Sequence, residues 1–337
     1  MNAPLAKEPI LDIAHFGRME LLTPKLDRSL WYFKDVLGME VVATEGRSIY
    51  MRAYGDYATS TFKLTEAAAP GVGCVSWRAV SPQALERRVK AIEAAGLGIG
   101  WQDGDFGRGR FYRFRDPEGH LMDLYFEEQK YEAPDHLRST LKNLPQKYTG
   151  RGIGVRRIDH LALMAKDVAK NREFAQNLLG FKLREQVVFN NGQTEIGSWM
   201  SVGPVHHEMA YVLDIKGGNA RMHHFSFWID NREDVLRAAD ILKENDIFIE
   251  AGPSKHNNSQ AFYLYSYEPG GNRIEIYSGS YLIFAPDFEP VRWNEEERGT
   301  GVYWGAPLPA SFIEYGTPDI PTPAPAGSEK TPVFDPQ

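Results

Sequence analysis

Short stretches in which large apolar residues alternate with small or polar ones recur along the chain and predict β-strands. Two of these stretches begin with histidine, at 160–163 (HLAL) and at 224–227 (HFSF). Because side chains alternate across a strand, each histidine shares one face with a small residue, while large apolar residues cover the other face. The pattern therefore predicts two strands that each turn a histidine toward open space and an apolar face toward a core.

The two halves of the chain repeat one another. Each half contains a strand followed by an amphipathic helix that ends at a glycine, Gly38 in the first half and Gly180 in the second. Further segments match in the same order: 74–77 with 224–227, 82–95 with 232–245, and 116–125 with 268–277. We therefore expect an α+β fold of four βαβββ modules paired into two similar domains, each an open, barrel-like β-sheet flanked by helices.

Changes in composition divide the chain further. The expected segments are an N-terminal two-module domain without a metal site at 1–131, a polar helical linker at 132–152, a C-terminal two-module catalytic domain at 153–285, a segment covering the active site at 286–316, and a proline-rich, disordered tail at 317–337.

Overall composition excludes several classes of function. A length of 337 residues with 42% hydrophobic residues is typical of two globular domains with sizeable cores. A net charge of −7 without a basic cluster makes nucleic acid an unexpected partner. No apolar run reaches the ~18 residues of a membrane helix. The single cysteine, Cys74, cannot form an internal disulfide, which favours a cytoplasmic location.

A third strand of the second half contributes an acidic residue. Residues 269–277 (PGGNRIEIY) predict a turn followed by a strand in which Glu275 takes one face and two isoleucines the other. Two imidazoles and one carboxylate on three different strands form a candidate facial triad for a divalent metal. The proposed metal ligands are His160, His224 and Glu275.

The first half differs at these three positions, where it carries Arg18, Cys74 and Asp123. An arginine side chain stays protonated in proteins and therefore cannot ligate a metal. We expect the first half to bind no metal and the second half to be the active one.

These residues resemble the type I extradiol ring-cleaving dioxygenases of the vicinal oxygen chelate superfamily, a group that includes the catechol 2,3-dioxygenases. The resemblance covers about residues 10–310. It implies that His160, His224 and Glu275 bind Fe(II). Imidazole and carboxylate ligands also suit Mn(II), so the residues themselves do not decide between the two metals.

The resemblance also implies roles for four residues that are not metal ligands. His207, eight residues after Trp199, matches the histidine that handles dioxygen and supplies a proton, and Trp199 matches a substrate-side tryptophan. His256 and Tyr265 match the histidine and tyrosine that hydrogen-bond the bound diol. The catalytic set is thus His207, His256 and Tyr265, and the substrate-binding set is Trp199, His256 and Tyr265.

Neighbouring residues compete with some of these assignments. His223 precedes His224 but falls on the face of Phe225, so it is interpreted as structural. His206 competes with His207, and Tyr263 has the same strand parity as Tyr265. The histidines that match no motif are interpreted as surface or structural residues: His15, His120 and His136.

The implied activity is extradiol cleavage of catechol or methylcatechols by dioxygen in aromatic degradation, giving products of the 2-hydroxymuconic semialdehyde type. The expected partners are a catecholic substrate and O2, and the family resemblance implies a homo-oligomer, a tetramer. Two alternatives remain open at this point: another vicinal oxygen chelate metalloenzyme (isomerase, epimerase or transferase), or a ligand-binding relative without enzymatic activity.

A departure from the resemblance concerns substrate charge. Relatives that cleave carboxylated catechols place arginines near the substrate, whereas this chain has Ala251 and the acidic run 295–297 at the matching positions. Lys255 and Arg298 are the possible substitutes, but Lys255 adjoins His256 and in an extended segment points the other way. We therefore expect a preference for catechols that are neutral apart from the diol.

Overall fold

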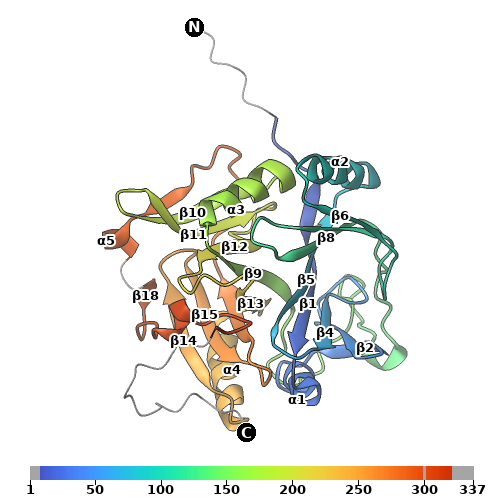
Figure 1. Cartoon of the computed structure of the whole chain (residues 1–337). Helices are drawn as coiled ribbons and strands as arrows, with labels where there is room; N and C mark the ends of the chain where they lie inside the picture. The colour runs from blue at the N-terminus through green and yellow to red at the C-terminus, as the bar shows by residue number, and fades with distance from the viewer. Residues whose placement is uncertain (1–7, 299–300, 321–337) are drawn as a thin grey trace.

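The computed structural model describes residues 8–298 and 301–320. Two similar halves lie side by side, with the first half (blue to teal) and the second half (green to red) on opposite sides of the view in Figure 1. Among the described helices, none has the length and apolar character needed to cross a membrane.

The first half is an eight-stranded mixed sheet of order β2-β3-β4-β1-β5-β8-β7-β6. Its elements are β1 (Ile13–Thr23), α1 (Leu26–Trp31), β2 (Glu40–Glu45), β3 (Ser48–Arg52), β4 (Phe62–Glu66), β5 (Gly71–Ala79), α2 (Pro82–Ala94), β6 (Gly98–Gln102), β7 (Phe111–Arg115) and β8 (Leu121–Tyr125).

The second half repeats this order and adds one strand at each edge, giving β17-β10-β11-β12-β9-β13-β16-β15-β14-β18. Its elements are β9 (Arg157–Ala165), α3 (Val168–Phe174), β10 (Lys182–Phe189), β11 (Thr194–Ser201), β12 (Met209–Leu213), β13 (Met222–Trp228), α4 (Arg232–Glu244), β14 (Ile249–His256), β15 (Ala261–Tyr267), β16 (Arg273–Gly279), β17 (Val291–Trp293), α5 (Glu295–Arg298), β18 (Val302–Trp304) and α6 (Ser311–Glu314).

The identical strand order confirms the expected α+β fold of four βαβββ modules. In each half, the first strands of the two modules pair antiparallel in the middle of the sheet, β1 with β5 and β9 with β13. Each of these central strands also pairs parallel with the last strand of its own module. The strands that carry the predicted metal ligands are therefore all central.

The helix that follows the first strand ends alike in both halves. A π-helical turn follows α1 at Tyr32–Val36 and α3 at Ala175–Leu179. The predicted glycines come next, and Gly38 and Gly180 both have φ of +83°. A Cβ atom at Gly180 would lie 2.5 Å from the carbonyl oxygen of Ile10, so a larger residue would both strain and crowd this turn.

The main core joins the two halves. Phe225 of β13 stacks on Phe62 of β4 with ring centroids 5.7 Å apart, and it also meets Phe16 of β1 edge-to-face at 6.1 Å. Leu161 and Leu163 of β9 are buried in the same cluster. Full burial of one such side chain contributes about 1.5–3 kcal/mol. The apolar faces of the predicted strands thus anchor β9 and β13 from behind.

Two expectations about connecting segments are wrong. The linker 132–152 is irregular, with only a short 3-10 turn at Asp135–Leu137. Pro134 and Pro145 supply no backbone N–H, and the segment lacks the apolar periodicity that would hold a helix against the core.

The second correction concerns the start of the tail, because Thr317 forms an antiparallel bridge with Met222, the first residue of β13. The backbone N–H of each residue donates to the carbonyl of the other at 2.8 Å. Residues 317–320 are therefore ordered, and the remainder of the expected tail, 321–337, lies outside the described residues.

Candidate metal centre and active-site pocket

Three central strands bring the predicted ligands together. Nε2 of His160 lies 2.8 Å from Oε2 of Glu275, and Nε2 of His224 lies 3.3 Å from Nε2 of His160 and 3.4 Å from the same Glu275 oxygen. One ligand atom from each side chain lies within 4.8 Å of the others, and all three residues are buried. Within the described residues, this is the only group of histidine, cysteine and acidic side chains with such spacing.

The geometry fits a bound divalent cation. Oε2 of Glu275 is buried and close to both imidazoles, yet it has no hydrogen bond of acceptable geometry within the described residues. Two imidazole nitrogens and a carboxylate oxygen therefore converge on one point. Two imidazoles with one carboxylate form the donor set of facial-triad metal sites, which leave further positions open to ligands.

The charges around the three ligand atoms favour a bound cation. Burial alone would lower the pKa of His160, but the negative charges of Glu275 and Asp159 outweigh it and raise the pKa to about 9. Burial lowers the pKa of His224 to about 4. For Glu275, burial is outweighed by the charge of neighbouring His160, so its pKa lies well below the usual range. An ionised carboxylate beside a neutral imidazole suits a metal cation.

Hydrogen-bond partners on the Nδ1 atoms, which face away from the metal point, orient the two ligand rings. Nδ1 of His160 is 2.8 Å from Oδ2 of Asp159, and such carboxylate partners fix the ring and the tautomer of a ligating histidine. Nδ1 of His224 is 2.6 Å from Nδ1 of His223, whose Nε2 contacts the carbonyl oxygen of Phe312 at 2.6 Å.

This placement of His223 corrects the sequence interpretation. The register between β13 and β9 shifts between Met222 and His224, which indicates a bulge. The bulge breaks the simple alternation, so His223 does not join Phe225 in the core but lines the pocket beside His224. Its Nε2 faces a backbone carbonyl, which leaves His224 as the residue directed to the metal point.

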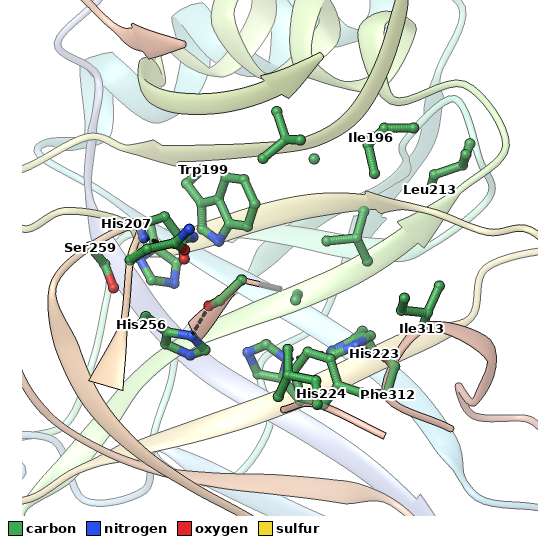
Figure 2. Close-up of a pocket in the computed structure, with 18 of the residues that line it drawn as sticks. Ile196, Trp199, His207, Leu213, His223, His224, His256, Ser259, Phe312 and Ile313 are labelled. Atoms are coloured by element: carbon green, nitrogen blue, oxygen red, sulfur yellow. Dashed lines mark hydrogen bonds between the residues drawn. The ribbon is translucent and has the colours of Figure 1, made fainter. Parts of the chain in front are cut away.

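A cavity of about 240 Å³ opens in front of the triad. Figure 2 shows His207 and His256 on the left and Ile196 and Leu213 on the right, with His223 beside Ile313. The lining is largely apolar; besides the residues discussed individually it includes Val187, Phe189, Val212, Ile215, Trp293, Leu308 and Phe312. Trp293, Leu308, Phe312 and Ile313 come from the segment 286–316, which therefore forms one side of the pocket.

His207 and Trp199 lie on the side of the pocket formed by β11 and β12. His207, in the turn between these strands, has its ring centroid 4.0 Å from that of His160. Trp199 also lines the cavity (Figure 2). A Cβ atom at Gly197 would lie 2.8 Å from the Trp199 ring, so glycine at that position leaves room for the indole.

His256 and Tyr265 approach from the other side, on β14 and β15. Nε2 of His256 is 3.1 Å from the Tyr265 hydroxyl and 3.6 Å from Oε1 of Glu275. Burial and the charge of Glu275 raise the pKa of Tyr265 well above its usual value, so this phenol stays protonated. Its competitor Tyr263 stacks on the His256 ring at 3.8 Å and is not among the pocket-lining residues.

Sequence interpretation missed several pocket residues. Tyr277 lines the cavity 4.7 Å from the His160 ring, and its parity with Glu275 on the same strand was a usable signal. Other contributions, from Asn257 to Ser259 and from Phe312, come from loops and a short helix that follow no periodic pattern.

Strand registers confirm that Asp123 in the first half is equivalent to Glu275 in the second. Asp123 of β8 lies opposite Ser76 of β5, as Glu275 of β16 lies opposite Ser226 of β13. The differences in the first half are therefore substitutions at matching places in one fold.

Ion pairs occupy the equivalent place in the first half. Nη1 of Arg18 bonds Oδ1 of Asp105 at 2.8 Å, and Nη2 of Arg108 bonds Oδ2 of Asp123 at 3.1 Å. Cys74 is buried beside them, and burial raises the pKa of its thiol well above the usual value. The guanidinium groups take the place of a cation there.

We accordingly expect the full-length protein to bind one divalent metal ion per chain. The first half offers paired arginines in place of free ligands, and the second half offers one triad. Metal analysis after reconstitution and removal of excess ion measures the ratio. A ratio of two, with the second ion lost on Asp123→Ala, would contradict this interpretation of the first half.

Comparisons with known proteins agree with this geometry. A family model described as the Glyoxalase/Bleomycin resistance protein/Dioxygenase superfamily matches residues 13–124 and 157–276. A metapyrocatechase from Geobacillus stearothermophilus is 44% identical over 93% of this chain and 96% of its own length. A manganese-dependent 2,3-dihydroxybiphenyl 1,2-dioxygenase from Geobacillus genomosp. 3 is 40% identical over 88% of this chain and 95% of its own.

The fold is also shared with solved structures. An extradiol ring-cleaving dioxygenase from B. fuscum superimposes with a TM-score of 0.80 at 26% identity, covering 93% of this chain and 84% of that one. The superfamily model covers both repeats, and the relatives match nearly end to end. The chain therefore belongs to the glyoxalase/bleomycin resistance protein/dioxygenase superfamily and, within it, to the extradiol ring-cleaving dioxygenases.

Proposed function

We propose that this enzyme cleaves catechol and small apolar-substituted catechols beside the diol, using dioxygen and a metal held by His160, His224 and Glu275. The observation that carries the proposal is that metal ligands and proton-exchanging side chains line one apolar cavity. The triad forms its floor, and His207, His256 and Tyr265 add proton-exchanging groups on both sides.

Fe(II) is the metal we propose, and Mn(II) is the alternative. Both accept two imidazoles and one carboxylate. The manganese dependence named for a 40% identical relative keeps the second metal open for this chain. The bound metal would hold the diol and dioxygen next to each other and allow electron density to pass between them.

The side chains of the pocket manage the protons. A catechol must lose protons to act as a chelating ligand, and a neutral imidazole is a suitable acceptor. Burial lowers the pKa of His207 well below its usual value, so this ring is neutral before substrate binds. The Tyr265 hydroxyl, which contacts His256, would hydrogen-bond a diol oxygen and stabilise its charge.

Apolar walls hold the ring. Trp199 on one side and Phe312 on another line the space above the triad. Desolvation of the aromatic ring favours binding by roughly 25 cal/mol per Å² of apolar surface buried. The ring is therefore held in place by packing, while the diol is held by polar groups.

An oxygen-uptake assay tests the proposed function. Protein reconstituted anaerobically with Fe(II), or with Mn(II), is mixed with each member of a catechol panel in oxygenated buffer. We expect stoichiometric oxygen consumption and a ring-opened, yellow semialdehyde-type product. An isomerase, an epimerase, a transferase or a ligand-binding relative would consume no oxygen with any catechol.

Substrate charge provides a sharper prediction. The described pocket lining contains no lysine or arginine, and Lys255 lies over the rings of Phe262 and Tyr303 instead. The side chain of Arg298, the other possible partner, lies outside the described residues. A buried carboxylate without a cationic partner costs several kcal/mol, and ~1.4 kcal/mol is tenfold in binding. We expect kcat/KM for protocatechuate and homoprotocatechuate to fall at least ~100-fold below that for catechol.

A matched pair of substrates isolates the effect of charge. 4-Methylcatechol and protocatechuate carry a methyl and a carboxylate at the same ring position, so their shapes are similar. The account predicts that 4-methylcatechol and 3-methylcatechol react at rates comparable to catechol. If a carboxylated compound reacted fastest, the neutral-pocket inference would be wrong, and Lys255 and Arg298 would be the first residues to substitute.

A further inference from the structure

His206 and Glu185 are buried on the side of His207 that faces away from the cavity. Nδ1 of His206 is 2.8 Å from Nδ1 of His207, and Nε2 of His206 is 2.8 Å from Oε1 of Glu185. All three side chains are buried, with 2% of Glu185, 2% of His206 and 5% of His207 exposed. A continuous hydrogen-bonded line therefore runs from β10 to the pocket.

Glu185 is held firmly in this arrangement. Its Oε1 also accepts from the Tyr281 hydroxyl at 2.7 Å and from the backbone N–H of Ser259 at 2.9 Å, and its Oε2 accepts from Nε1 of Trp293 at 2.6 Å. Burial alone would raise the pKa of Glu185, but His206 and the hydrogen bonds from Ser259 and Trp293 outweigh burial and lower it. The carboxylate is thus ionised and acts only as an acceptor.

The direction of each hydrogen bond follows from this. Because Glu185 can only accept, the proton on His206 lies on Nε2, and Nδ1 of a neutral His206 must be an acceptor. The hydrogen in the contact between the two rings then belongs to Nδ1 of His207. Nε2 of His207 carries no proton, has no hydrogen-bond partner among the described residues, and belongs to a side chain that lines the pocket.

We propose that Glu185 and His206 are positioning residues for His207: the carboxylate fixes the tautomer of His206, which in turn keeps Nε2 of His207 unprotonated and available to the pocket. The inference deepens the proposed function, in which His207 exchanges a proton with the substrate. Nε2 accepts a proton from a catechol hydroxyl and later returns it to an oxygen of the opened ring. Throughout, Nδ1–H of His207 donates to His206, and Glu185 offsets the positive charge.

Glu185→Gln tests the hydrogen-bonded line from Glu185 to His207. An amide can donate as well as accept, so His206 and His207 can adopt the opposite tautomers, which place a proton on Nε2 of His207. We expect kcat/KM for O2 to fall about 10- to 100-fold. The metal content should stay within about twofold of the wild-type value, because no metal ligand has changed.

Two further variants separate positioning from simple packing. Tyr281→Phe removes one donor to the same carboxylate but leaves the line to His207 intact, so it should stay within about threefold of wild type. His206→Phe removes both ring nitrogens at similar volume and should reproduce the Glu185→Gln split. Loss of metal in parallel with turnover would assign Glu185 a structural role and overturn the proposal, as would unchanged kcat/KM for O2.

A measurement on the wild-type protein reads the tautomer directly and uses a variant only for assignment. In the [15N]histidine spectrum of holoenzyme carrying diamagnetic Zn(II), His207, assigned by its absence in His207→Phe, should appear as the Nδ1–H tautomer. A resonance pattern with the proton on Nε2 would overturn the proposal. Because the tautomer is read without turnover, its result is independent of the proposed function, which fails separately if the wild-type enzyme cleaves no catechol.

Discussion

His224→Ala is expected to lose both the bound metal and all measurable ring cleavage while the protein stays folded. His224 supplies one of three ligand atoms within 4.8 Å of one another, and an open-sided triad has no spare ligand. Loss of one ligand that contributes about 3 kcal/mol already weakens binding by more than about 100-fold. Core packing is preserved because the aromatic face of β13 lies on the opposite side from this residue. Metal analysis, circular dichroism and oxygen uptake measure the three properties, and His160→Ala and Glu275→Ala should behave alike.

Cys74→Ala is the matched control, since Cys74 occupies the position of His224 in the first half. It should keep one metal per chain and full turnover. A His224→Ala protein that retained stoichiometric metal would mean that the neighbouring His223, which also borders the pocket, is the ligand.

His207→Phe should have the second largest effect. It should retain the metal and still bind catechol anaerobically, because His207 is not one of the three ligand residues. Turnover should fall by about 10²–10⁴, the usual contribution of a positioned proton donor or acceptor. Stopped-flow mixing of the anaerobic substrate complex with oxygen measures the affected step.

The exposed His136 supplies a control, since His136→Phe removes a histidine far from any assigned role. Unchanged turnover of His207→Phe at saturating catechol and oxygen would reject the assignment of His207. His206→Phe is unsuitable as a silent control, because His206 is hydrogen-bonded to both His207 and Glu185.

The fold and the positions of the three ligands could be predicted because they follow regular patterns. Strand alternation placed His160 and Glu275 opposite the core, and the internal repeat placed Arg18 and Asp123 at the matching positions of the first half. The strand registers bear out the equivalence of Asp123 and Glu275. Alternation along a strand and repetition between the two halves are both visible in a single sequence.

Features that depend on irregular backbone or distant contacts could not be predicted. The bulge before His224 moves His223 from the expected core face to the pocket, and alternation alone does not reveal such a bulge. Glu185 lies 21 residues before His206 on a different strand, and its role appears only when the tertiary structure joins them. Phe312 reaches the pocket from a short helix whose packing no local pattern encodes.

The most direct test of the account combines metal stoichiometry with the fate of dioxygen. Protein reconstituted with Fe(II) or Mn(II) is freed of excess metal, mixed with catechol under 18O2, and the product is analysed by mass spectrometry. The account predicts one metal per chain and a 2-hydroxymuconic semialdehyde in which both atoms of one O2 molecule have been incorporated. Turnover by metal-free protein, cleavage between the two hydroxyl groups, or the absence of any ring-opened product with a fully loaded site would contradict it.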